Sequence, residues 1–319
     1  MPRENTHATS RRVHRGLLIP LGAFVTLVVG LCLPLAMPAS ADQPGGEALF
    51  GPARGDTLHV MSYNLRFAAY AGPHSWPKRR PVLAELLRRE QPTVLGTQEG
   101  LYPQLTDIER DLPGYYDWLG EGRAGGRRDE FVAIFFDTRR LEPLASGHFW
   151  LSDTPDVPGS KSWGNTSIRM ATWARFTDKR TGGELVVLNT HLDNASEYAR
   201  TRGAELIRDR INEFPPGLPI ILTGDFNAAA QRSPQYDVLV AGMADTWTAA
   251  DDRRTPANAT WHGFGPLIPD GARIDWILTR GARVQAVGIN TYNRDGRYAS
   301  DHLPAQALLT LDQSPATAP

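Results

Sequence analysis

Six short apolar runs lie along the chain, and several of them end abruptly in a polar residue. The runs are of strand length, are rich in Val, Ile, Leu and Phe, and are bounded by Gly, Pro or charged turns, a pattern typical of buried β-strands. They cover residues 58–64, 93–99, 131–136, 184–191, 219–225 and 273–278. We therefore predict six strands whose ends present polar side chains.

Two segments between these runs have helical periodicity. Apolar residues recur three and four positions apart in residues 81–90 and 198–214, and each segment is followed closely by proline. Strands that alternate with helices and long loops predict an α/β protein whose sheets are covered by helices. This pattern does not distinguish a doubly wound sheet from a two-sheet sandwich.

The first 41 residues have the pattern of a signal peptide. Arg11, Arg12 and Arg15 precede an apolar run over residues 16–37, and Ala39-Ser40-Ala41 supplies the small residues of a cleavage site. We expect cleavage after Ala41 and a secreted protein, an uncleaved membrane anchor being the alternative.

The export route stays open at this stage. The sequence Ser10-Arg11-Arg12 resembles the start of a twin-arginine signal, but His14 stands where that signal usually has a large apolar residue. The Sec route is therefore the alternative.

Cleavage would change the composition of the chain. Cys32, its single cysteine, would be lost, so the mature protein could form no disulfide. The 34 basic and 35 acidic residues would become 30 and 34, because residues 1–41 contain four arginines and one glutamate. A formal charge of −4 gives no global basic field for nucleic acid.

The mature chain reads as one domain with loose ends. Residues 42–56 and 313–319 are rich in small residues and proline, which predicts a flexible lead-in and a flexible tail. Residues 57–312 form the domain between them.

The polar strand ends form six motifs. Singly, each motif is explained by a turn, a surface charge or a packed histidine. Asp225 and Asn227 alternate along what we predict to be an extended segment, so both side chains would project to the same side. The motifs are Met61–Arg66 with Asn64, Gly96–Glu99, Asn189–Leu192 with His191, Thr223–Asn227, Arg273–Ile277 with Asp275, and Ser300–Pro304 with Asp301 and His302.

In this order and spacing, the motifs resemble those of the endonuclease/exonuclease/phosphatase superfamily, over residues 57–311. The superfamily includes deoxyribonucleases, abasic-site endonucleases, sphingomyelinases, inositol-polyphosphate phosphatases and deadenylases. The resemblance implies a four-layered α/β/β/α sandwich of the deoxyribonuclease I-like type. It also implies a metal-dependent phosphoric ester hydrolase.

The resemblance also implies roles for the metal-binding residues. Glu99 is similar to the family's principal metal-binding glutamate, and Asn64 and Asp301 to residues beside the metal and the phosphate. Oxygen ligands of this kind suit Mg²⁺, with Mn²⁺ as the alternative ion.

The catalytic roles follow in the same way. Asp225 matches the aspartate that orients or deprotonates the attacking water, and Asn227 a residue that stabilises the transition state. His302 matches the histidine at the scissile phosphate, and Asp275 the carboxylate that orients it.

Three further residues match less distinctive positions. His191 resembles the second active-site histidine of the deoxyribonuclease branch, and Glu130 its partner glutamate. Arg169 stands where members place an arginine or tyrosine against the phosphate. For Glu130 the alternative is a surface ion pair with Arg127 or Arg128.

The expected substrate is a phosphodiester or phosphomonoester in a nucleic acid, a sugar phosphate or a phospholipid head group. An extracellular nuclease and a catalytically inactive binding module are the alternatives. Aromatic and basic residues in segments 74–80 and 149–164 could meet such a substrate or could pack loops onto the body. We expect a monomer with no obligate protein partner.

Overall fold

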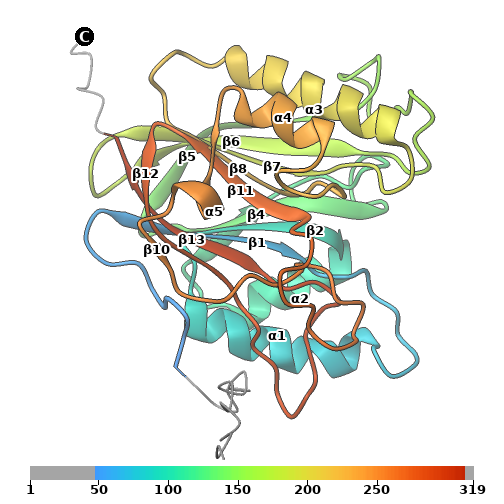
Figure 1. The fold of residues 1–319 in the computed structure, drawn as a ribbon, viewed down its shortest axis with the longest axis vertical. Coiled ribbons are helices and arrows are strands. Elements are labelled where there is room, and N and C mark those ends of the chain that lie inside the picture. The colour runs from blue at the N-terminus through green and yellow to red at the C-terminus, as the bar shows by residue number, and fades with distance from the viewer. Residues whose placement is uncertain (1–46, 313–319) are drawn as a thin grey trace, which may run out of the picture. The chain divides into compact units, whose positions relative to one another are not determined.

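A computed structural model of the chain describes residues 47–312. Two β-sheets lie face to face, and helices cover the outer side of each sheet (Figure 1). This is the predicted α/β/β/α sandwich. The predicted signal peptide and flexible tail lie outside the described residues. No helix within residues 47–312 has the length and apolar character needed to cross a membrane.

The first sheet has seven strands in the order β10-β12-β13-β1-β2-β4-β3. β1 pairs in parallel with β2 and antiparallel with β13, so Thr57 near the start of the domain lies beside Thr310 near its end. The strands are β1 (Thr57–Asn64), β2 (Val94–Leu101), β3 (Tyr116–Leu119), β4 (Glu130–Asp137), β10 (Asp252–Arg253), β12 (Ala282–Ile289) and β13 (Ala305–Leu311).

The second sheet has six strands in the order β5-β6-β7-β8-β11-β9. β7 and β8 run parallel, and β11 pairs antiparallel with β8. The strands are β5 (Leu141–Trp150), β6 (Met170–Asp178), β7 (Glu184–His191), β8 (Ile220–Asp225), β9 (Ala244–Asp245) and β11 (Asp275–Arg280). The six predicted strands correspond to β1, β2, β4, β7, β8 and β11.

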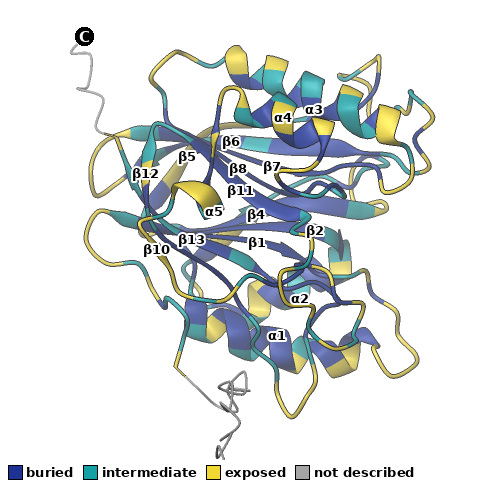
Figure 2. Cartoon of the chain, viewed as in Figure 1, coloured by how far each residue is buried: buried dark blue, intermediate teal, exposed yellow. Residues whose placement is uncertain are grey.

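Helices bury one face each against the sheets and leave the other exposed (Figure 2). α1 (Trp76–Glu90) and α2 (Tyr102–Asp111) pack on the first sheet. α3 (Glu197–Asn212) and α4 (Pro234–Val240) pack on the second, and the short α5 (Thr246–Ala249) contacts β11 and β12. α1 and α3 contain the predicted helical segments, and Gln91 ends α1 in a left-handed conformation just before Pro92.

Strand side chains alternate between two cores because successive residues of a strand face opposite sides. In β1, Val60 enters the core between the sheets, whereas Met61 faces α1 and α2. The core between the sheets is almost entirely aliphatic and aromatic.

A buried polar network joins the two sheets beside this core. Asn189 of β7 donates from Nδ2 to the carbonyl oxygens of Thr97 (2.8 Å) and Ala133 (3.0 Å) in the first sheet. Its Oδ1 accepts from Gln98 Nε2 of β2 at 2.7 Å. Gly96 is required here because a Cβ at that position would lie 2.1 Å from Thr223 Oγ1. The sheets are thus held in one register directly below the strand ends.

The described end of the expected flexible lead-in is anchored rather than loose. The buried Glu90 carboxylate accepts hydrogen bonds from the backbone N–H groups of Leu49, Phe50 and Gly51. It also accepts one from Asn290 Nδ2. Small residues and a proline suggested mobility, but a carboxylate 40 residues away along the chain fixes this backbone.

Candidate active site

Three neighbouring strands of the second sheet end at one point. His191 ends β7, Asp225 ends β8 and Asp275 begins β11, and the strand register pairs both His191 and Asp275 with Asp225. Because residues opposite each other in adjacent strands share a face, their side chains gather at this edge. Apolar strand residues precede His191 and Asp225 and follow Asp275, and they fix that register.

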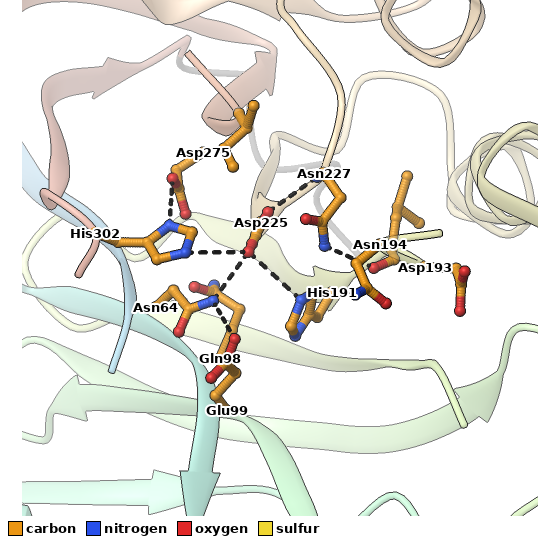
Figure 3. Close-up of polar contacts among 12 residues, drawn as sticks. Asn64, Gln98, Glu99, His191, Asp193, Asn194, Asp225, Asn227, Asp275 and His302 are labelled. Atoms are coloured by element: carbon orange, nitrogen blue, oxygen red, sulfur yellow. Dashed lines mark hydrogen bonds and ion pairs between the residues drawn. The ribbon is translucent and has the colours of Figure 1, made fainter. Parts of the chain in front are cut away.

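Asp225 lies at the centre of the gathered side chains (Figure 3). Its Oδ2 accepts from Asn64 Nδ2 at 2.9 Å and lies 3.4 Å from His191 Nε2 and 3.8 Å from His302 Nε2. Asn64 belongs to β1 and His302 to the loop before β13. Both sheets therefore contribute to one buried polar centre.

His302 is fixed by a carboxylate behind it. Its Nδ1 donates to Asp275 Oδ2 at 2.9 Å, and both side chains are buried. Burial favours the neutral imidazole, but the charge and hydrogen bond of Asp275 prevail and raise the pKa of His302 to about 10. His302 is therefore a cation at neutral pH, and its Nε2–H faces the centre.

The pKa values of Asp225 and His191, the other two titratable groups of the centre, are shifted in opposite directions. Burial, followed by the charge of Asp275, raises the pKa of Asp225 to about 7. Burial, followed by the charges of Arg169 and Arg123, lowers the pKa of His191 well below its ordinary value. The site thus holds one cationic histidine, one neutral histidine and a carboxylate that titrates near neutrality, which is suited to acid–base chemistry.

Glu99 is presented to the site by a β-bulge. The register between β2 and β4 shifts between Thr97 and Gly100, and Glu99 has a φ of +62°, an uncommon backbone conformation that occurs often at functional sites. Its Oε1 accepts from Asn64 Nδ2 at 3.0 Å, and Oε2 accepts from Phe67 N at 3.1 Å.

The donor set around Glu99 fits a hard divalent cation. Ligand atoms of Glu99, His191 and Asp225 all lie within 4.8 Å of one another. Glu99 is more exposed than the other two, so water and a phosphate can complete the coordination of an ion there. A second such group, Asp225, Asp275 and His302, is already engaged in the His302–Asp275 hydrogen bond.

The two other predicted metal-site residues face different partners. Asn64 turns its amide nitrogen toward Glu99 and Asp225, while its Oδ1 accepts from Arg66 N at 2.9 Å, so it orients the two carboxylates. Asp301 lies 3.7 Å from Arg66 Nη1 and accepts from Ser300 Oγ. Among the described residues, Asp301 belongs to neither of the two groups whose ligand atoms lie close together.

Asn227 reaches the site by a turn and not by strand alternation. β8 ends at Asp225, and Asn227 has a φ of +47°, so the predicted extended segment is wrong. Its backbone N–H donates to Asp225 Oδ1 at 2.9 Å, which closes the turn. One hydrogen of its Nδ2 is bound to Leu192 O at 3.0 Å, which leaves the other for a ligand.

Arg169 is buried at the side of His191. Its Nη2 donates to Asn194 Oδ1 at 3.2 Å, and its Nε lies 3.9 Å from Asp193 Oδ2. Asp193 is itself held by the backbone N–H groups of Ala195 and Ser196. Nε and Nη1 of Arg169 have no hydrogen-bond partner, which is rare for buried donors and typical of a binding site.

Glu130 forms an ion pair with Arg123, at 2.8 Å from Nη1, rather than with Arg127 or Arg128. Burial outweighs the charge of Arg123 and raises the pKa of Glu130 to about 7. Glu130 and His191 line the same small cavity, so the predicted neighbourhood of the two residues is present.

Several aromatic and basic residues suggested for substrate contact have structural roles instead. Trp76 is buried and donates to Asp107, and Arg79 is fully buried among backbone carbonyl oxygens, including that of Leu65 at 2.7 Å. Arg80 pairs with Asp111. The alternative reading, in which these side chains pack loops onto the body, is correct for this segment.

Four residues of the site escaped the sequence analysis: Gln98, Arg123, Asn189 and Asp193. Gln98 and Asn189 stand inside motifs already singled out, and Asp193 follows one directly, so their proximity to Glu99 and His191 was a usable signal. Arg123 lies in a glycine-rich loop with no pattern around it.

Comparison with known proteins gives a consistent result. The model of the "Endonuclease/Exonuclease/phosphatase family" matches residues 61–302. A mannosyl-6-phosphatase of Bacteroides thetaiotaomicron is 36% identical, with a TM-score of 0.73 over 79% of this chain and 99% of that one. A family protein of the same organism is 35% identical, with a TM-score of 0.75 over 81% of this chain and 98% of that one.

Curated relatives match over shorter stretches. Protein angel of Drosophila melanogaster is 27% identical over 224 residues, which are 62% of this chain and 60% of that protein. The chain spans about half to two thirds of the length of the curated relatives that it matches.

Proposed function

Because this chain belongs to the endonuclease/exonuclease/phosphatase family, whose members hydrolyse phosphoesters, we propose that it is a secreted, Mg²⁺-dependent hydrolase of sugar phosphates. The observation that carries the proposal is the convergence of Asn64, His191 and His302 on the buried carboxylate of Asp225. Such a centre serves in-line attack of water on phosphorus.

Glu99 would hold the ion, and a bound Mg²⁺ would offset negative charge on the phosphoryl oxygens. Mn²⁺ has the same preference for oxygen ligands and is the expected substitute.

Asp225 is the base. Its carboxylate accepts a proton from the attacking water while the water oxygen forms a bond to phosphorus and the bond to the leaving oxygen breaks. The leaving oxygen takes up a proton from solvent and departs as a hydroxyl group. Asn64 keeps Oδ2 of Asp225 in position through the 2.9 Å hydrogen bond. A base that titrates near pH 7 combines a large ionised fraction with useful basicity.

His302 stabilises the charge that develops in the transition state. Its Nε2–H points into the centre, and Asp275 keeps the ring protonated and correctly turned. Asn227 offers its remaining amide hydrogen to the same oxygens. These donors are fixed before substrate arrives, so little reorganisation opposes the reaction.

A sugar phosphate is the preferred substrate for two reasons. The match between this chain and the mannosyl-6-phosphatase extends over 99% of the length of that protein. Trp261, whose exposed fraction is 50%, forms an antiparallel backbone bridge with His302. Residues opposite each other in such a pair share a face, so we propose its ring as a platform for a sugar. The basic segment that a nuclease would use is engaged in packing.

Secretion rests on the signal-peptide pattern of residues 1–41, and we infer a monomer without an obligate partner.

The test is an assay of the purified protein with Mg²⁺, with Mn²⁺ and with excess EDTA. Mannose 6-phosphate, glucose 6-phosphate, DNA, RNA and sphingomyelin are the substrates. We expect phosphate release from a hexose phosphate that EDTA and Asp225→Asn both abolish, with the exposed Asp237→Asn as the matched control. Full activity in EDTA would refute metal dependence, and cleavage of nucleic acid alone would identify a nuclease.

A further inference from the structure

A small cavity opens beside His191. Its volume is about 10 Å³, and Arg123, Glu130 and Arg169 line it together with His191. A space of this size accommodates about one water-sized atom. It is therefore too small for a second phosphate group, a base or a sugar ring.

Arg169, which lines this cavity, has two donors without a partner. Nε and Nη1 are buried without a hydrogen-bond partner, and the residue is only 5% exposed. Asp193 lies 3.9 Å from Nε, too far for a hydrogen bond. Buried guanidinium donors that lack partners are costly unless a ligand meets them, and oxyanions are the ligands that fit them best.

Arg123 contributes a second guanidinium, and its backbone is fixed on both sides. Its backbone N–H donates to Glu130 O at 2.9 Å, and its carbonyl oxygen accepts from Trp150 Nε1 at 2.7 Å. Glu130 binds Nη1. Nε lies 3.0 Å from Asp129 Oδ2 but in an orientation that makes no hydrogen bond. Arg123 is thus preorganised and still has donors to offer.

A phosphomonoester and a phosphodiester differ in what the third oxygen on phosphorus carries. A monoester has three non-bridging oxygens and carries close to two negative charges at neutral pH. In a diester the third oxygen carries a carbon and no charge. A cavity that holds one atom beside two guanidinium groups accepts the free, charged oxygen of a monoester. It excludes the carbon-bearing oxygen of a diester.

We propose that Arg123 and Arg169 form a receptor for the third non-bridging oxygen of a phosphomonoester, and that Arg123 determines specificity for monoesters over diesters. The inference rests on the proposed phosphoester hydrolysis and narrows its substrate class. The feature that carries it is the pair of guanidinium groups around a cavity of one-atom size next to the catalytic centre.

The test compares p-nitrophenyl phosphate with bis(p-nitrophenyl) phosphate. Arg123→Gln should lower kcat/KM for the monoester about 10- to 100-fold, the usual effect of losing a hydrogen bond to a charged group, and change the diester rate less than about 3-fold. Arg127→Gln is the matched control, because that guanidinium is exposed and lies over the Tyr102 ring. Arg123→Lys keeps the charge, and we expect an intermediate loss.

A binding measurement gives a readout independent of turnover. Calorimetry on the protein in EDTA should show that Arg123→Gln weakens the binding of inorganic phosphate about tenfold and leaves dimethyl phosphate unaffected.

Equal losses on both p-nitrophenyl substrates would overturn the inference and leave the proposed hydrolysis intact. A wild-type enzyme that prefers the diester would overturn the inference and the choice of a sugar phosphate as substrate, but not phosphoester hydrolysis itself. Hydrolysis of neither substrate class with any divalent ion would remove the proposed function and this inference together.

Discussion

Replacement of Asp275 by Asn should move the alkaline limit of activity. The change removes the largest of the charges that hold the pKa of His302 at about 10. The burial that favours the neutral ring remains, and the charges of Asp225 and Asp301 still oppose it. A return to the ordinary value of 6.5 would lower the cationic fraction of His302 at pH 8 from about 99% to about 3%. We therefore expect kcat at pH 8 to fall about 30-fold.

The fall in kcat caused by Asp275→Asn should be small at low pH. At pH 6 most of the imidazole of the variant is still protonated, so kcat there should change about twofold or less. The assay is kcat as a function of pH between 5.5 and 9.5, at saturating Mg²⁺, for wild type and Asp275→Asn. Circular dichroism at each pH confirms that both remain folded.

A double-mutant cycle measures the coupling between Asp275 and His302. If Asp275 acts through His302, Asp275→Asn should have little further effect in a His302→Ala background. An equal fall at pH 6 and pH 8, or multiplicative losses in the double mutant, would refute the reasoning. Asp237→Asn, an exposed change of the same kind, is the control.

The same pair links stability to pH. Because the pKa of His302 is raised in the folded state, its contribution to stability is fully present below about pH 6.5 and is lost as pH rises toward 10. The thermal midpoint of the wild type should therefore decline over this range more than that of the His302→Ala variant.

Three further outcomes are expected. Asn189→Ala removes the 2.7 Å acceptor of Gln98 and the side-chain donor to two backbone carbonyl groups, and should destabilise the fold by about 2–4 kcal/mol; an unchanged urea midpoint would contradict this. Glu99→Gln should raise the Mg²⁺ concentration for half-maximal activity about tenfold or more, and a metal titration identical to the wild type would count against Glu99 as a ligand. Protein recovered from culture medium should begin at Asp42, which intact mass tests directly.

The fold was predictable where a strand is buried on both sides. The runs that became β1, β4, β7 and β8 have an apolar core and are buried almost throughout, because helices cover one face of each sheet and the other sheet covers the opposite face. β5 lies at the edge of its sheet and has exposed residues through its middle, so it lacks this signal. β6 alternates buried and half-buried positions and was missed as well.

The site was predictable where chemistry follows a strand end. Asp225, Asp275 and His191 end up adjacent because strand register carries that information over long distances in the chain. Arg123 could not be found in this way, since its position depends on Trp150 and Glu130, which belong to other strands. The left-handed turn at Asn227 was also beyond a strand-alternation argument, because backbone hydrogen bonding to Asp225 decides it.

The pairing of β1 with β13 has a consequence for when the enzyme becomes active during its synthesis. β1 leaves the ribosome early, but its antiparallel neighbour is the last strand of the domain, and Ser300 must reach back to the carbonyl oxygen of Asn64. A nascent chain that has not passed Leu311 lacks the strand that completes the first sheet. Hydrolytic activity is therefore expected only after the whole domain has been made, so unfinished chains and fragments clipped near the C-terminus should not attack phosphoesters inside the cell.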